Sequence, residues 1–437
     1  MNREYPLFSV VLCLQLTANL LPGNEEDDWH RRPLRPEVSP SFDTKQGPQP
    51  ADKTFTIRAG DVEGTAGAWV KRFHVTGGDH YRFLALRHTS GVKSPRRSAP
   101  AKITWQDTRG KLVRGYGEDL ARPEYPADNG TNAQGWTRVT ATYRAPPGAK
   151  FALVELHLRW AQNAEVRWRD ISLAKTTAPP NRKVRLASIH FRPQGNKSAK
   201  ANRELFAPYI ARAAAKKADL VCLGEALTLV GTGLNYVDVA EVIPGPSTEY
   251  FGALSKKHNL YLVAGLLERS GPAVYNTAVL MAPDGSLQGK YRKVCLPREE
   301  IEGGVTPGKD YPVFQTRFGK LGMMICWDVH FPEVARNLSV HGAEVIAMPI
   351  WGGNPALAAA RAIENQIFLV SSTYSSPQSD TMKSGVWDQT GKLLAQGRNW
   401  GEVHVVEVDL AKRKQWPWLG DFKARIHRER PTGGFRD

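Results

Sequence analysis

The stretch that decides the fold of this chain is KLGMMICWDVHFPE, residues 320–333. It begins with an apolar run too short for a helix and ends at Cys326, and a segment with helical spacing starts at Pro332. We predict a buried strand, a tight turn and a helix. Unpaired N–H groups and the dipole at the helix N-terminus favour negative charge, so the sequence predicts a stabilised Cys326 thiolate. The alternative is that Cys326 is only a small core residue.

Short apolar runs and helical segments alternate on both sides of this stretch. Pro208 should kink the first helix or mark its true first turn. Alternation of this kind predicts layered α/β packing around a largely buried sheet. We expect strands at residues 184–189, 220–223, 260–266, 277–282, 321–325, 345–349 and 367–372, and helices at 201–217, 248–258, 332–341 and 355–365.

Three polar residues stand at the ends of apolar runs, where open α/β sheets place their chemistry. They are Glu225 in LGEA, Lys293 in KYRKVCLP, and Cys326. These stretches resemble the Glu-Lys-Cys triad of the nitrilase, or carbon–nitrogen hydrolase, superfamily, in that family's chain order. Further family-like pieces are PGP (244–246), YNTA (275–278), TPG (306–308), FPE (331–333) and RAIEN (361–365). The resemblance covers residues 183–410 and implies a nitrilase-like four-layer αββα sandwich and a homo-oligomer.

The residue types also suit the chemistry that the resemblance implies. Attack on an amide or nitrile carbon needs a thiolate, and Glu225 would act as the general base that takes the Cys326 proton. Lys293 would stabilise the oxyanion together with a backbone N–H, that of Trp327. Taken singly, a Glu or a Lys at the end of a strand is usually only solvated.

Two further residues are candidates for the substrate site. The family often carries a second glutamate soon after the lysine, and spacing favours Glu300, although this charged cluster could be a solvated loop. Trp351 follows an expected strand and would line the site or serve as packing. The resemblance implies no metal and no cofactor.

The two residues after Cys326 bear on which reaction of the superfamily we expect. Cys-Trp-Asp is closer to amidases and N-carbamoyl hydrolases than to nitrilases, which more often show Cys-Trp-Glu. We therefore expect a hydrolase that cleaves a non-peptide C–N bond of a linear amide or N-carbamoyl compound through a cysteine thioester. The alternatives are a nitrilase proper, or a non-catalytic glycan-binding protein on a hydrolase scaffold.

Residues 54–175 instead show a period of two, typical of an antiparallel β-sandwich. The segments VRWRDISL (166–173), GWTR (135–138) and APPGA (145–149) resemble galactose-binding-like, carbohydrate-binding jelly rolls. The resemblance implies an all-β jelly-roll-like domain with a glycan as ligand, while strand aromatics more often pack in a core.

The chain ends and the composition complete the expectations. Arg3 and the mostly apolar residues 7–21 predict a signal peptide over residues 1–22 and export to the periplasm or medium, with a cytoplasmic protein as the alternative. This segment is too short and polar to span a membrane. Residues 23–53 read as a flexible linker and 411–437 as a C-terminal extension. The net charge is +16, but the basic residues are scattered, which argues against nucleic-acid binding.

Overall fold

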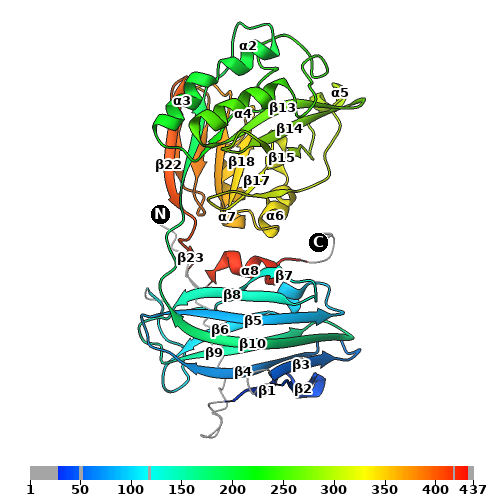
Figure 1. Ribbon diagram of the computed structural model, residues 1–437, viewed down its shortest axis with the longest axis vertical. Helices are drawn as coiled ribbons and strands as arrows, with labels where there is room; N and C mark the ends of the chain where they lie inside the picture. The colour runs from blue at the N-terminus through cyan, green and yellow to red at the C-terminus, as the bar shows by residue number, and fades with distance from the viewer. Residues whose placement is uncertain (1–27, 49–52, 117–119, 417–418, 432–437) are drawn as a thin grey trace, which may run out of the picture. The chain divides into compact units, whose positions relative to one another are not determined.

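The computed structural model describes residues 28–48, 53–116, 120–416 and 419–431 (Figure 1). The expected signal peptide lies outside these residues. The contacts divide the chain into two compact units, residues 1–178 with 417–420 and residues 179–416 with 421–437, and each is described by itself. No helix in the described ranges is both long and apolar enough to cross a bilayer.

The first unit contains two antiparallel sheets that enclose one core. One sheet has the order β1 (His30–Pro33), β4 (Ala66–His74), β9 (Phe151–Arg159), β6 (Ala101–Gln106). The other has the order β2 (Ser41–Gln46), β3 (Lys53–Ala59), β10 (Ala164–Thr176), β5 (His80–Ser90), β8 (Thr137–Arg144), β7 (Ala127–Thr131). A short helix, α1 (Pro95–Ser98), and a single 3-10 turn (Pro36–Val38) interrupt the strands.

Alternation along the strands explains why the two sheets pack together. On β10, Val166 and Trp168 are fully buried, whereas Arg167 and Arg169 between and beside them are not. The Trp69 indole on β4 donates a hydrogen bond of 3.1 Å to the Thr56 carbonyl on β3 and so links the sheets. Apolar residues of period two therefore form the core, and the intervening polar residues face away from it.

The expectation of a flexible linker over residues 23–53 is wrong for its described strands. Strand β1 pairs with β4, and β2 pairs with β3 along its whole length. The charged composition misled the interpretation because edge strands are held by backbone hydrogen bonds and can expose most of their side chains. Phe42 supplies an apolar anchor, with its ring 5.5 Å from that of Trp69.

The second unit contains two six-stranded sheets, each partly parallel. The first has the order β15 (Leu287–Arg292), β14 (Ala273–Met281), β13 (Tyr261–Ser270), β12 (Leu220–Cys222), β11 (Lys183–His190), β22 (Glu402–Asp409). The second has the order β16 (Val313–Gln315), β17 (Lys320–Met323), β18 (Val345–Pro349), β19 (Phe368–Ser372), β20 (Gly385–Trp387), β21 (Leu393–Gln396).

Helices cover the outer faces of these sheets and make a four-layered α/β sandwich. One core joins the inner faces of the two sheets. A second core packs α3 and α4 on the first sheet, and α6 and α7 pack on the second sheet (Figure 1). The helices are α2 (Ala199–Glu204), α3 (Ala207–Ala215), α4 (Pro246–His258), α5 (Arg298–Glu302), α6 (Pro332–Val340) and α7 (Pro355–Asn365).

Local signals decide where these helices begin. Asn354 caps α7 by accepting a hydrogen bond of 2.9 Å from the Ala356 amide, and Pro355 follows at the first turn. The single helix expected over residues 201–217 is two helices, α2 and α3, and Pro208 marks the first turn of α3. The expectation was therefore wrong about continuity and right about the proline.

Several strands of the second unit escaped the sequence prediction. These are β15, β16 and β20–β22, which are short or carry polar residues at most positions. They are held by backbone pairing with neighbouring strands, a long-range effect that periodicity does not record. At the C-terminal end, β23 (Gln415–Trp416) and β24 (Gly420–Asp421) form a two-stranded sheet, followed by α8 (Phe422–Glu429).

Candidate active site

Glu225 follows β12 and is buried, with 3% of its surface exposed. Its Oε1 accepts hydrogen bonds from Lys293 Nζ at 2.9 Å and Asn276 Nδ2 at 2.8 Å, and its Oε2 accepts one of 3.0 Å from the Trp351 amide. The turn needs Gly265 on the neighbouring β13, because a Cβ there would stand 2.6 Å from the Glu225 Cα. The carboxylate is thus fixed by three donors.

Lys293 immediately follows β15 and its side chain is fully buried. The ammonium donates to Glu225 and to Glu300 Oε1, and Glu300 is itself buried on α5. Burial disfavours the charged amine, but Glu225, Cys326 and Glu300 outweigh it and raise the pKa of Lys293. The lysine therefore carries its charge throughout the neutral pH range.

Cys326 lies at a sharp turn between β17 and α6. Its φ is +42°, in the left-handed region, and it opens a short 3-10 helix, Cys326–His330. This conformation is uncommon for a non-glycine residue, because its Cβ crowds the backbone there. The strand and helix expected here are therefore present, but the cysteine begins a 3-10 turn and is six residues from Pro332, where α6 starts.

The expectation that the helix N-terminus stabilises a Cys326 thiolate stays a prediction, and two features of the site act against it. Burial raises the pKa of Cys326, and the negative charge of Glu225 raises it further, against the opposing effect of Lys293. The site consequently holds a neutral thiol next to a carboxylate that can accept its proton.

The two predicted tryptophans are both partly exposed. Trp327 is 37% exposed and its ring lies 4.3 Å from that of His330. Trp351 follows β18, is 40% exposed, and contacts Tyr374 edge to face at 5.5 Å. The Trp351 amide, rather than its ring, donates the hydrogen bond to Glu225.

The Asp328 side chain links the turn at Cys326 to the end of β15, which Lys293 follows. Its Oδ2 accepts from the Ile325 amide at 2.8 Å and from the Tyr291 hydroxyl at 2.7 Å, and its Oδ1 accepts from the Cys295 amide at 2.9 Å. Burial raises the pKa of Asp328 to about 6, although these donors oppose the shift. The Asp328 carboxylate therefore fixes the position of Ile325, just before Cys326, relative to Cys295, which follows Lys293.

Sequence reasoning gave no role to two residues of this site. Asn276 on β14 donates to Glu225 and, at 3.2 Å, to Glu300. Tyr374 follows β19, and its hydroxyl donates to the Glu225 carbonyl at 2.8 Å. The available signal for Asn276 was a polar residue in an otherwise apolar strand, and for Tyr374 a position just past the end of a strand.

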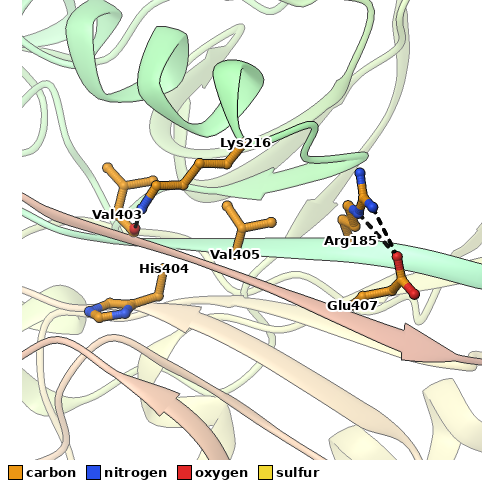
Figure 2. A pocket seen from close by; sticks show the side chains of 6 residues that line it. All are labelled: Arg185, Lys216, Val403, His404, Val405 and Glu407. Atoms are coloured by element: carbon orange, nitrogen blue, oxygen red, sulfur yellow. Dashed lines mark hydrogen bonds and ion pairs between the residues drawn. The ribbon is translucent and has the colours of Figure 1, made fainter.

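A separate hollow of about 430 Å³ lies between α3 and the strands β11 and β22 (Figure 2). Lys216 donates to the Val403 carbonyl at 2.8 Å, and Arg185 pairs with Glu407 at 3.1 Å. None of the predicted site residues lines this hollow. Each of its charged side chains already has a hydrogen-bond or ion-pair partner among the described residues.

Comparisons with known proteins place the second unit in a family. The model of the Carbon-nitrogen hydrolase family matches residues 185–417. The omega-amidase NIT2 of Xenopus tropicalis is 30% identical over 251 residues, which cover 52% of this chain and 89% of that protein. A nitrilase of Pyrococcus abyssi is 35% identical over 242 residues, covering 52% of this chain and 90% of that protein.

Among solved structures, Saccharomyces cerevisiae Nit3, a member of branch 10 of the nitrilase superfamily, is 25% identical with a TM-score of 0.47, covering 52% of this chain and 90% of that chain. The family model spans more than half of the 437 residues. The chain belongs to the carbon-nitrogen hydrolase family and is an enzyme that hydrolyses carbon–nitrogen bonds.

Proposed function

We propose that this enzyme hydrolyses a linear amide or N-carbamoyl compound through a thioester on Cys326. The observation that carries the proposal is the contact of Glu225 with both of the other groups. Its carboxylate accepts a hydrogen bond of 2.9 Å from Lys293, and it lies close enough to the Cys326 thiol for its charge to raise the pKa of that thiol. A carboxylate placed between a thiol and a permanent cation can move protons while the cation holds developing negative charge.

The first half of the reaction forms the thioester. Glu225 takes the thiol proton as the Cys326 sulfur attacks the carbonyl carbon, and the carbonyl oxygen gains a negative charge. The Lys293 ammonium and the Trp327 backbone N–H stabilise that oxyanion. Glu225 then gives its proton to the departing nitrogen, so ammonia or an amine leaves and the acyl group stays on sulfur.

The second half releases the acid. Glu225 takes a proton from water, the resulting hydroxide attacks the thioester carbon, and the same two donors stabilise the second oxyanion. The sulfur leaves and recovers its proton from Glu225. Because the resting pKa of Cys326 is raised, the thiolate forms only as the proton transfers, which ties the nucleophile to the presence of substrate.

Glu300 and Asn276 would orient the leaving amide. Glu300 Oε2 and Asn276 Oδ1 are buried acceptors without a hydrogen-bond partner among the described residues. Buried acceptors of this kind usually find a donor, and an amide NH₂ group supplies two. A nitrile carries no N–H, which favours an amide or carbamoyl substrate over a nitrile. The names of relatives, omega-amidase and nitrilase, span both alternatives.

Ammonia release from a panel of short linear amides, N-carbamoyl amino acids and matched nitriles tests the proposal. Wild type should turn over amides or carbamoyl compounds, and intact-mass spectrometry after rapid quenching should detect the acyl adduct. Cys326→Ala should lose both signals. Cys295→Ala is the matched control, because Cys295 is also a free cysteine close to Lys293 and burial raises its pKa to about 12.

The outcomes separate the alternatives. Turnover by Cys326→Ala equal to that of wild type would refute the thioester mechanism. Acid release from nitriles with no turnover of amides would favour the nitrilase reading. If Cys295→Ala lost turnover and the adduct while Cys326→Ala kept them, the nucleophile would be misassigned.

A further inference from the structure

The outer face of the six-stranded sheet in the first unit is rich in arginine. On β5, β8 and β10 the buried core residues, such as Phe83, Val139 and Trp168, alternate with partly or fully exposed cations. Because side chains alternate across a strand, these cations share the side of the sheet away from the core. We call this set the arginine face, and it comprises Arg82, Arg138, Arg144, Arg167 and Arg169.

The strand register places these arginines in a long strip. Arg138 on β8 and Arg169 on β10 are both opposite Leu86 of the intervening β5. Arg167 is opposite His88, and six residues further along β5 Arg82 is opposite Thr142. At about 3.3 Å per residue, the strip from His88 to Arg82 is about 20 Å long. A small anion could contact only one part of it.

The positive charge of the strip is only partly neutralised. Glu165 contacts Arg167 at 3.2 Å and Asp170 contacts Arg169 at 3.7 Å, in both cases with partly exposed side chains. Arg82 and Arg138 form no ion pair and no side-chain hydrogen bond with any residue that the structure describes. The face therefore keeps an excess of positive charge available to an anionic partner.

Aromatic rings stand at both ends of the strip. The Trp136 ring centroid lies 4.2 Å from the Arg169 guanidinium and 5.7 Å from that of Arg167. Asn132 holds the Trp136 turn through a hydrogen bond of 2.9 Å from the Trp136 amide. At the other end, Tyr116 lies 4.7 Å from the Arg144 guanidinium. These rings are rigid apolar surfaces flanked by cations.

We propose that the arginine face binds an acidic polysaccharide. Such a chain repeats both features that the strip complements: carboxylate or sulfate groups that pair with guanidinium, and sugar rings whose C–H faces stack on an indole or phenol. Single-stranded nucleic acid fits less well, because its bases stack on successive aromatic side chains, and here the two rings are separated by the arginines. This binding is separate from the C–N hydrolase site and does not depend on it.

Affinity electrophoresis and calorimetry of the full chain with polygalacturonate and dextran sulfate test the proposal, with neutral dextran as reference. Wild type should bind the two acidic polymers and not dextran. Arg138→Gln/Arg169→Gln should weaken binding by about tenfold or more and reduce its salt dependence. Trp136→Ala should weaken binding while leaving the salt dependence close to that of wild type.

The matched control is Arg31→Gln/Arg114→Gln, which removes the same charge from exposed positions elsewhere in this unit. It should bind the acidic polymers as wild type does, and all variants should keep the far-ultraviolet circular dichroism spectrum. An equal loss in this control would overturn the proposal in favour of non-specific attraction. Full competition by poly-dT at equal charge concentration would overturn it in favour of nucleic acid.

Discussion

Replacing Lys293 with methionine tests whether one buried cation both stabilises the site and takes part in the reaction. Methionine matches the stem of the lysine but removes the ammonium. Glu225 and Glu300 would then be two buried carboxylates, 3% and 5% exposed, without their shared counter-charge. Removing one partner of a buried ion pair costs about 3–5 kcal/mol, so we expect the free energy of unfolding of the hydrolase unit to fall by that amount.

Turnover should fall for a separate reason. Loss of an oxyanion donor lowers kcat by about 10²- to 10³-fold. The double variant Lys293→Met/Glu300→Gln separates the two effects, because it removes one of the uncompensated charges without restoring the donor. We expect it to recover at least about 2 kcal/mol of stability and none of the lost kcat.

Pulse proteolysis in urea, read from peptides of residues 179–416, measures the stability of this unit without interference from the sandwich. Ammonia release under saturating substrate measures kcat. Recovery of wild-type turnover in the double variant would refute a direct role for the ammonium. Wild-type stability of Lys293→Met would refute the claim that the ammonium compensates the buried carboxylates.

Four further results are expected. Asp328→Asn should lower kcat about tenfold or more, because an amide cannot accept all three hydrogen bonds that the carboxylate accepts. Separate measurement of kcat and KM should show that the loss is in kcat. The folded pKa of Asp328, about 6, is above its ordinary value of 3.8. Its contribution to the free energy of unfolding is therefore greatest below pH 3.8 and falls by about 3 kcal/mol as the pH rises through 6. Urea unfolding across this pH range should show the fall in wild type and not in Asp328→Asn. Tyr374→Phe should reduce kcat by less than tenfold, since it removes one hydrogen bond to the Glu225 backbone, and an unchanged pH profile would show that the carboxylate itself is undisturbed. Trp168→Ala should destabilise the sandwich by about 3–5 kcal/mol with no change in kcat, and a loss of turnover at temperatures where the hydrolase unit stays folded would contradict this.

Local sequence patterns predicted most of the helices and central strands of the hydrolase unit. The apolar runs before Glu225 and Cys326 predicted strands, and the structure has β12 and β17 ending just before these two residues. The position of a polar residue that follows a buried strand can be predicted from sequence, because it must lie at the carboxyl-end edge of the sheet. The capping and proline signals at α7 were equally local.

The sequence alone therefore determined the α/β alternation, the order of the three candidate catalytic groups and the period-two pattern of residues 54–175. Tertiary structure alone decided that residues 30–33 and 41–46 join the sandwich, and that Asn276, Tyr374 and Asp328 support the site. It also decided that burial and the charge of Glu225 raise the pKa of Cys326. The physical reason is shared by all of these: each depends on burial and on contacts between segments far apart in the chain, which local periodicity does not contain.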